Sequence, residues 1–348
     1  MSEIVKPGCY MWGGSDSWQF GQKIPNRAIE VWERDNGWIN QHHLLEIDLS
    51  SYYDREGRGI ADYRGLDLQI NLAKRIIDGG GEVQLMCWAT PAHLSSVPLT
   101  WNDGGRASWM KYKPKVLRNR YGRITFDGNL EWAKILVTVL RRIMAKVPSD
   151  RLWIGIGMEA HRFKFRNPVS DFLNFVDIVQ KELRTVNNLV HIGMTQVPDL
   201  IDGQLGRMQH FIPTFDFIER YLNTARQKNW RVDFIPLFEY SGDAERMRSY
   251  IQQAWGLLNL CGFGSAEIIW NGLSPEANIR DTQMGVEKSI EVGKMLLEEG
   301  VNRACWDFLE DSEPETATQH DNGLLTYQTL APRPRYELAK RVCNMNGF

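Results

Sequence analysis

The sequence has no long hydrophobic run, no strong charge bias and few cysteines, and each shortage excludes a class of protein. No apolar stretch approaches the ~20 residues that cross a bilayer, and the first ten residues lack the apolar core of a signal peptide. We therefore expect no membrane partner and a cytoplasmic protein. Lys and Arg number 41 against 43 Asp and Glu, so the formal net charge of −2 provides no field that would attract nucleic acid.

The chain also lacks the short motifs of metal and cofactor sites. Its five cysteines are scattered, odd in number and without zinc-ligand spacing, so we expect reduced and mostly buried thiols. There is no HExxH, CxxC or GxSxG motif, and no GxGxxG follows the first expected strand. The sequence thus implies no metal and no cofactor.

Short apolar runs alternate with longer amphipathic segments, a rhythm typical of βα units around a parallel sheet. The eight runs that we expect to be strands are Gly8–Trp12, Leu44–Leu49, Val83–Trp88, Leu152–Met158, Val190–Gln196, Val232–Phe238, Ala266–Trp270 and Arg303–Phe308. Eight strands separated by helices predict one (β/α)8 barrel, an α/β fold, over residues 1–348.

Three features refine this expectation. The three glycines 79–81 follow a predicted helix and precede a strand, which indicates a helix C-cap rather than a phosphate loop. The segment Asp281–Gly300 is expected to be a helix with Asp281 as its N-cap. A long irregular stretch at about 91–126 follows the third strand; it is either a functional βα loop or a surface insertion without a role.

In such a barrel the reacting groups lie where the strands end. Carboxylates, histidines and aromatic residues follow the expected strands at Trp88, His93, Glu159, His161, Glu239, Tyr240, Trp270, Asn271, Trp306, Asp307 and Glu310, with Glu267 inside the seventh strand. Two facing carboxyl groups are what glycoside hydrolysis requires, about 5 Å apart in retaining and ~6.5–9.5 Å apart in inverting enzymes. The 13 tryptophans suit sugar stacking or core filling equally well.

Glu159 is the leading candidate for a general acid/base. It follows a strongly apolar strand, which would place its carboxyl group at the mouth of the barrel with little water around it. The alternative is a surface glutamate paired with Arg162 or Arg166.

The last third of the chain resembles glycoside hydrolase family 39, the β-xylosidase and α-iduronidase family of clan A. The matching segments, in order along residues 215–341, are Val232-Asp233-Phe234-Ile235 to Tyr240, Trp270-Asn271 with Ser274-Pro275 and Asp281-Thr282, Trp306-Asp307-Phe308 with Glu310-Asp311, Gly323-Leu324-Leu325, and Arg333-Pro334-Arg335-Tyr336. The N-terminal half matches more loosely, at Trp88 to His93 and at Glu159. The resemblance implies a barrel that acts on a carbohydrate.

The resemblance places Glu159 on the family's acid/base glutamate but departs at other positions. Met158 stands for the Asn that contacts the sugar 2-hydroxyl, Ala160 for the following Pro, and Phe238 for a His of the sixth strand. Ile269 occupies the place of the nucleophile, and an isoleucine cannot attack an anomeric carbon.

A second carboxylate must therefore come from elsewhere. Glu267 shares a strand face with Ile269 but lies about 6.6 Å deeper, Glu239 ends the neighbouring strand, and Asp307 or Glu310 would suit an inverting distance. The sugar subsites would be shaped by His93, Tyr240, Trp270, Asn271 and Trp306.

Three interpretations remain open. The first is a glycosidase with a relocated second carboxylate, Glu239 or Glu267, opposite Glu159. The second is a barrel that binds a glycan without cleaving it, or serves as a structural module, as the lost family residues favour. The third is an unrelated barrel chemistry such as a lyase or isomerase. The sugar, its linkage and the oligomeric state are not determined by the sequence.

Overall fold

The structure, a computed structural model, describes most of the regular elements and the short turns between them. It describes residues 5–11, 26–48, 64–88, 126–147, 149–157, 169–184, 189–198, 212–239, 243–273, 279, 281–309, 324–326 and 329–345. The stretch 91–125 and the expected site residues His93, Glu159, His161, Tyr240 and Glu310 lie outside the described residues.

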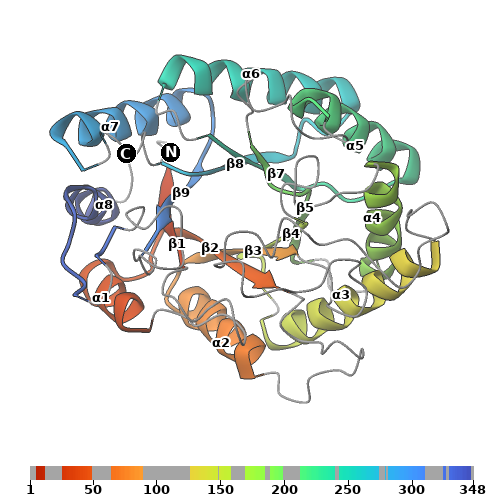
Figure 1. Cartoon of the computed structure of the whole chain (residues 1–348), viewed down its shortest axis with the longest axis horizontal. Coiled ribbons are helices and arrows are strands. Elements are labelled where there is room, and N and C mark those ends of the chain that lie inside the picture. The colour runs from red at the N-terminus through yellow and green to blue at the C-terminus, as the bar shows by residue number, and fades with distance from the viewer. Residues whose placement is uncertain are drawn as a thin grey trace, which may run out of the picture.

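Parallel strands form the centre of the molecule (Figure 1). They are β1 (Lys6–Tyr10), β2 (His42–Asp48), β3 (Glu82–Trp88), β4 (Leu152–Ile156), β5 (His191–Gly193), β6 (Val197–Pro198), β7 (Phe234–Phe238), β8 (Glu267–Asn271) and β9 (Arg303–Phe308). The sheet order is β5-β4-β3-β2-β1-β9-β8-β7-β6. Because β5 also pairs with β7 through Gly193 and Phe234, the sheet closes on itself. β5 and β6 both pair with β7 and together take the place of one barrel strand, which we call the fifth wall strand.

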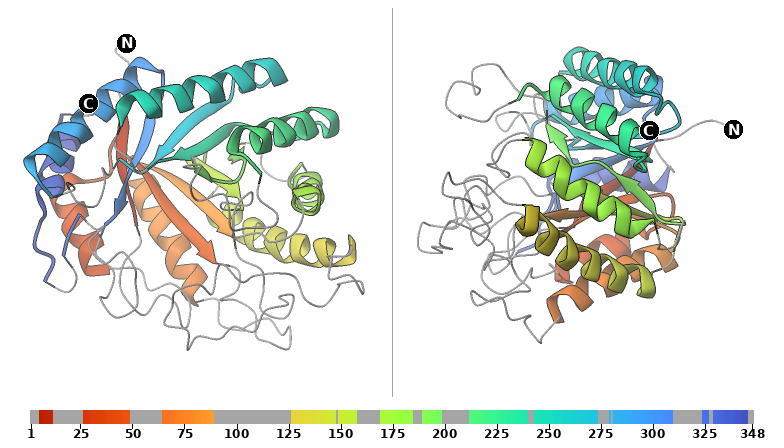
Figure 2. Two further views of the ribbon diagram at one scale, coloured as in Figure 1. Left: turned by 45° about the horizontal axis from the view of Figure 1, so that its top comes forward. Right: turned by 90° about the vertical axis from the view of Figure 1, so that its right-hand side faces the viewer.

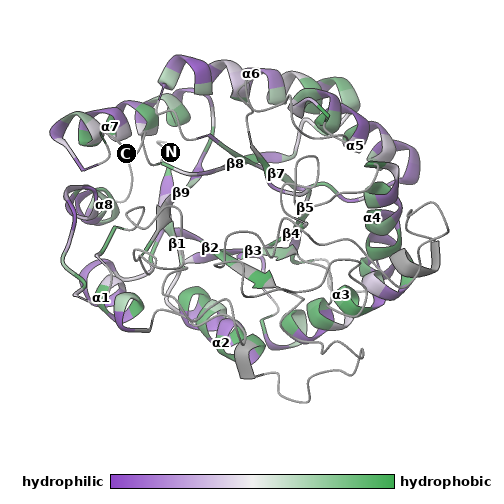
Figure 3. Ribbon diagram, in the orientation of Figure 1, coloured by the Kyte–Doolittle hydropathy of each residue, from purple (hydrophilic) through white to green (hydrophobic). Residues whose placement is uncertain are grey.

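Helices surround the strands on the outside, as the two turned views in Figure 2 show. They are α1 (Asn26–Asn36), α2 (Arg64–Asp78), α3 (Phe126–Lys146), α4 (Val169–Leu183), α5 (Thr214–Lys228), α6 (Ala244–Cys261), α7 (Gln283–Glu298) and α8 (Pro334–Asn344). Each carries hydrophobic and hydrophilic residues side by side (Figure 3), as expected of a helix that buries one stripe. The arrangement is the predicted (β/α)8 barrel.

Strand residues alternate between two buried environments, because successive side chains point to opposite faces. On β8, Ile268 and Trp270 belong to the large core shared with the helices. Ile269 instead packs with Trp153 of β4 and Phe234 of β7, a cluster without helix residues. Such a cluster lies inside the barrel, as does a second one formed by Leu44, Met86 and Cys305.

The expected strands all occur, with ends shifted by a few residues, but the fifth is broken. The sequence predicts one run over Val190–Gln196. In the structure only β5 lies within that run, and β6 begins directly after it. All five cysteines are buried and unpaired, as predicted.

The two helix-end predictions have different outcomes. The glycines after α2 cap it: Gly80 has φ +93° and Gly81 donates its N–H to the carbonyl of Ile76. The expected cap of α7 was wrong, because Thr282 is the N-cap and its Oγ1 accepts from the N–H of Gly285 at 3.2 Å. Asp281 instead pairs with Arg333 and Arg335.

Candidate active site

Glu239 directly follows β7, at the C-terminal end of that strand. Its carboxylate side chain is buried. The apolar strand FIPLF brings it there, and only 4% of the residue is exposed. Its Oε1 lies 3.8 Å from Nε of Arg246, in the first turn of α6. That turn is fixed by the N-cap Asp243, whose Oδ1 accepts from the N–H groups of Glu245 and Arg246 at 3.1 Å. A buried carboxylate is thus held beside a guanidinium at the C-terminal end of β7.

Asn271 ends the neighbouring strand β8 and faces the barrel interior. It lies two residues after Ile269 and in register with Cys305, and both of these belong to interior clusters. The residue is 4% exposed, and neither Oδ1 nor Nδ2 has a hydrogen-bond partner among the described residues. An unpaired buried polar group costs roughly 1–3 kcal/mol, so this amide is available to a bound molecule.

The two tryptophans expected at the sugar subsites lie elsewhere. Trp270 and Trp306 are fully buried and belong to the core between barrel and helices. Trp270 packs edge-on against Tyr250 of α6, with ring centroids 6.2 Å apart, and donates its indole N–H to the carbonyl of Gly272. Because neighbouring strand residues face opposite sides, Trp270 and Asn271 cannot both face the interior. Neither indole offers a face to a sugar.

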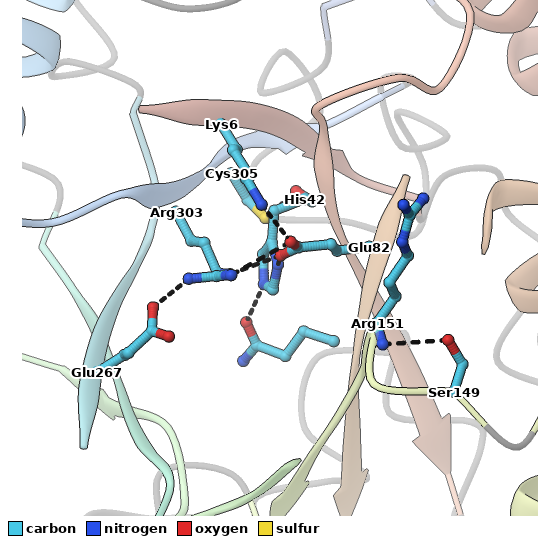
Figure 4. Close-up of polar contacts among 9 residues, drawn as sticks. Lys6, His42, Glu82, Ser149, Arg151, Glu267, Arg303 and Cys305 are labelled. Carbon is cyan, nitrogen blue, oxygen red and sulfur yellow. Dashed lines mark hydrogen bonds and ion pairs between the residues drawn. The ribbon is translucent and has the colours of Figure 1, made fainter. Parts of the chain in front are cut away.

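Glu267, the deeper candidate for the second carboxylate, lies at the other end of the barrel from Glu239. It is the first residue of β8 and is in register with Phe234, the first residue of β7. Glu239 comes five residues after Phe234, a separation of roughly 16 Å along the strand. Glu267 instead forms an ion pair with Arg303, the first residue of β9 (Figure 4).

Arg303 links Glu267 to a polar network at the N-terminal ends of the strands (Figure 4). Its Nε lies 2.5 Å from Oε2 of Glu82, and Lys6 pairs with the other oxygen of that carboxylate. His42 Nδ1 contacts Glu82 Oε2 at 3.2 Å, and its Nε2 lies 3.2 Å from Oε1 of Gln84. Five of these residues are the first residues of their strands: Lys6 of β1, His42 of β2, Glu82 of β3, Glu267 of β8 and Arg303 of β9. Gln84 is the third residue of β3. We call the set Lys6, His42, Glu82, Gln84, Glu267 and Arg303 the base network.

The charges of the base network stabilise one another. Burial raises the pKa of Glu82, but hydrogen bonds from His42 and Arg303 and the charge of Arg303 outweigh burial and hold the pKa well below its usual value. Burial lowers the pKa of His42. The guanidinium of Arg303 also lies over the Trp153 ring, 4.3 Å from the centroid. In this fold, the N-terminal face serves stability rather than catalysis.

The remaining expected residues are placed only in part. Trp88 and Asp307 lie at the C-terminal ends of β3 and β9. Ile269, at the position that the resemblance assigns to the nucleophile, is fully buried among apolar residues. The structure adds Gln196, between β5 and β6, which is 3% exposed and whose Oε1 has no partner among the described residues. It ends the fifth expected strand, and that position was the signal that could have identified it.

Two further findings concern metals and membranes. Within the described residues, no three His, Cys, Asp or Glu side chains are grouped so that they could hold a metal ion. None of the described helices is both long and apolar enough to cross a membrane.

No protein-family model and no curated protein matches this sequence, but solved structures do. An exo-β-1,4-mannosidase from Opitutaceae bacterium strain TAV5 superposes with a TM-score of 0.61 at 12% identity, over 99% of this chain and 60% of its own. A GH30 endoxylanase from Clostridium papyrosolvens C71 gives 0.57 at 16% identity, over 98% and 73%. A β-glycosidase from Pyrococcus horikoshii gives 0.59 at 9% identity, over 99% and 94%. At these identities, the chain shares the (β/α)8 fold of these glycosidases.

Proposed function

We propose that the protein hydrolyses a glycosidic bond at the C-terminal end of its barrel. The observation that carries this proposal is that Glu239 directly follows β7 and Asn271 ends the adjacent strand β8. A buried carboxylate and a buried amide without a described partner thus occur at the same end of the barrel. The glycosidase neighbours with the same fold support the substrate class.

In this proposal, Glu159 gives its proton to the leaving oxygen as the bond to the anomeric carbon breaks. It lies shortly after β4, and the wall strand made of β5 and β6 separates β4 from β7. The backbones of β4 and β7 are therefore about 10 Å apart, so carboxyl groups extending from their ends can face each other across a sugar. Glu239 attacks the anomeric carbon or takes a proton from the attacking water.

We assign Glu267 to the base network rather than to catalysis, because it lies at the end of the barrel that the sugar does not enter. Sugar contacts are proposed for Asn271 and for Trp88, His93, His161, Tyr240, Asp307 and Glu310. In the sequence, these polar and aromatic residues stand at or shortly after the ends of the strands.

The test is hydrolysis of a panel of 4-nitrophenyl α- and β-glycosides by the wild type and by Glu159→Gln, Glu239→Gln and Glu267→Gln. We expect the first two substitutions to lower kcat at least ~100-fold, because each removes a proton-transfer or nucleophilic group. Glu267→Gln should retain turnover but unfold at a lower temperature. Full activity in Glu239→Gln, or its loss only in Glu267→Gln, would refute this assignment.

A second function, glycan binding without turnover, is favoured by one specific observation. Ile269 fills the place of the nucleophile with a fully buried apolar side chain. Saturable binding of an oligosaccharide by the wild type, with no hydrolysis of any glycoside in the panel, would establish this function instead.

A further inference from the structure

The break in the fifth wall strand brings one amide side chain to an unusual place. Between β5 and β6 lie Met194, Thr195 and Gln196, all buried. Gln196 is 3% exposed, and no described residue hydrogen-bonds with its Oε1. Since a buried acceptor without a donor costs roughly 1–3 kcal/mol, this atom needs an explanation.

The pairing of β6 with β7 shows which way Gln196 points. Val197 is in register with Leu237, and both belong to the core shared with the helices. Side chains alternate along a strand, so the preceding residue, Gln196, faces the barrel interior. The same reasoning places Asn271 inside, because Trp270 is also in register with Leu237 and faces the helices.

Gln196 and Asn271 therefore flank β7 from its two sides. Their strands are about 10 Å apart, and Asn271 lies roughly two residues, or ~6.6 Å, nearer the C-terminal end. Phe238, the last residue of β7, separates them on the interior face. The two offsets combine to about 12 Å between the backbones, and both amide side chains point inward from these positions.

We propose that Gln196 and Asn271 form a subsite for the hydroxyl groups of a neutral sugar, an inference that rests on the proposed function and specifies its substrate class. The three atoms without described partners are Gln196 Oε1, Asn271 Oδ1 and Asn271 Nδ2. Two of them are acceptors and require a donor from the bound molecule. A hydroxyl group supplies both a donor and an acceptor, whereas an ionised carboxylate only accepts.

The described charges agree with a neutral ligand. Lys6 and Arg303 lie at the N-terminal end of the barrel and are paired with Glu82. Near the mouth, Arg246 lies beside Glu239. The carboxylate of a sugar acid would be repelled by the carboxylate of Glu239. It would also supply no donor to the two acceptor oxygens, Gln196 Oε1 and Asn271 Oδ1.

The experiment measures binding of D-xylose, D-glucose, D-mannose, D-galactose and, as the charged counterpart, D-glucuronate, by saturation-transfer NMR and calorimetry. The variants are Gln196→Met and Asn271→Leu, which keep shape and remove the amide. The matched control is Gln84→Met in the base network, where the amide contacts His42 and its Nε2 donates to Met86 Sδ at 3.0 Å.

We expect at least one neutral sugar to bind more tightly than D-glucuronate, and each of the two variants to weaken that binding at least ~10-fold. The same variants should unfold at a higher temperature than the wild type, because they remove polar groups that lack partners in the unbound protein. Gln84→Met should unfold at a lower temperature and bind the sugar normally.

The inference is overturned if no neutral sugar binds, if D-glucuronate binds as tightly, or if Gln196→Met and Asn271→Leu bind like the wild type. A lower unfolding temperature in both variants would also overturn it, since the amides would then be structural. Sugar binding that depends on both amides, without any glycoside hydrolysis, would refute the proposed catalysis and leave the subsite standing. Hydrolysis that both variants retain in full would do the reverse.

Discussion

Four buried polar residues in this barrel form two groups with opposite meanings. Glu82 and His42, at the N-terminal ends of their strands, are hydrogen-bonded and paired. Gln196 and Asn271, near the C-terminal ends, have amide atoms without described partners. Because unpaired buried groups reduce stability, the second group points to a binding role and the first to a structural one.

His43 predicts a pH dependence of stability. It lies between Trp32 and Trp38, accepts from the N–H of Cys9 at 3.1 Å, and contacts Gln41 Oε1 at 3.0 Å. Burial, followed by the charge of His42, lowers its pKa to about 3. The folded pKa is below the unfolded value of roughly 6.5, so below pH 6.5 the unfolded chain binds a proton that the folded chain does not.

The free energy of unfolding should therefore fall by about 1.4 kcal/mol per pH unit from this group as the pH drops from 6.5 toward 3. Urea unfolding at pH 5.5, 5.0 and 4.5, below the unfolded pKa and above the folded one, measures the slope. In His43→Gln the slope should be smaller by this amount, with the contribution of His42 remaining. Equal slopes in both proteins would contradict the prediction.

Gly193 predicts a steric cost. A Cβ at this interior position would lie 2.4 Å from the ring of Phe234, which is fully buried. We expect Gly193→Ala to lower the free energy of unfolding by about 1–3 kcal/mol. The matched control is Gly256→Ala on α6, where nothing lies within 4 Å of the new Cβ, and this change should stabilise by roughly 0.5–1 kcal/mol. Urea unfolding of both variants checks the contrast, and equal destabilisation would count against the packing argument.

At the scale of helices and strands, the sequence correctly predicts which segments are helices and which are strands. It predicts less well where these elements begin, end or break. The strands are apolar runs separated by amphipathic helices, a pattern that depends on local residues alone. The break after Gly193 and the cap of α7 depend on partners far along the chain: β6 pairs with β7, and Asp281 pairs with Arg333 and Arg335. No local pattern predicts those contacts.

The start of α7 offers a test that separates capping from ion pairing. Thr282→Ala should lower the free energy of unfolding by about 1 kcal/mol, because the N–H of Gly285 loses its acceptor. Asp281→Ala should cost more, on the order of 2–3 kcal/mol, because Arg335 is fully buried and loses a carboxylate at 3.5 Å. Thermal unfolding of the two variants gives the order. A larger cost for Thr282→Ala than for Asp281→Ala would contradict the ion-pair argument, and no cost for Thr282→Ala would contradict its role as the cap.

For the whole molecule, the sequence predicts the barrel but only part of the site. Consecutive residues Trp270 and Asn271 were both expected at the rim, although alternation allows only one of them to face the interior. The role of Glu267 depends on Arg303, 36 residues away, and on Glu82, 221 residues from Arg303. Such long-range ion pairs appear only once the strands are assembled.

The base network predicts how the whole barrel responds to acid. Glu82→Gln should lower the free energy of unfolding at pH 7 by about 3 kcal/mol, because Lys6 and Arg303 lose their shared carboxylate. Since the pKa of Glu82 is depressed in the folded state, its contribution is present above the unfolded pKa of roughly 4.3 and is lost as the pH falls below it. The variant should therefore lose less stability than the wild type between pH 5 and pH 3, as measured by urea unfolding. A parallel loss in both proteins would rule out this origin.

The packed interior of the barrel determines from which end a molecule can reach it. Ion pairs of the base network close the N-terminal end of the barrel. The side chains of Trp153, Phe234, Ile269, Leu44 and Met86 fill its interior, so the barrel has no channel through it. A molecule that enters must depart through the same opening, and a long polymer cannot be threaded through. Any exchange of a molecule with the barrel must therefore take place at the C-terminal ends of the strands.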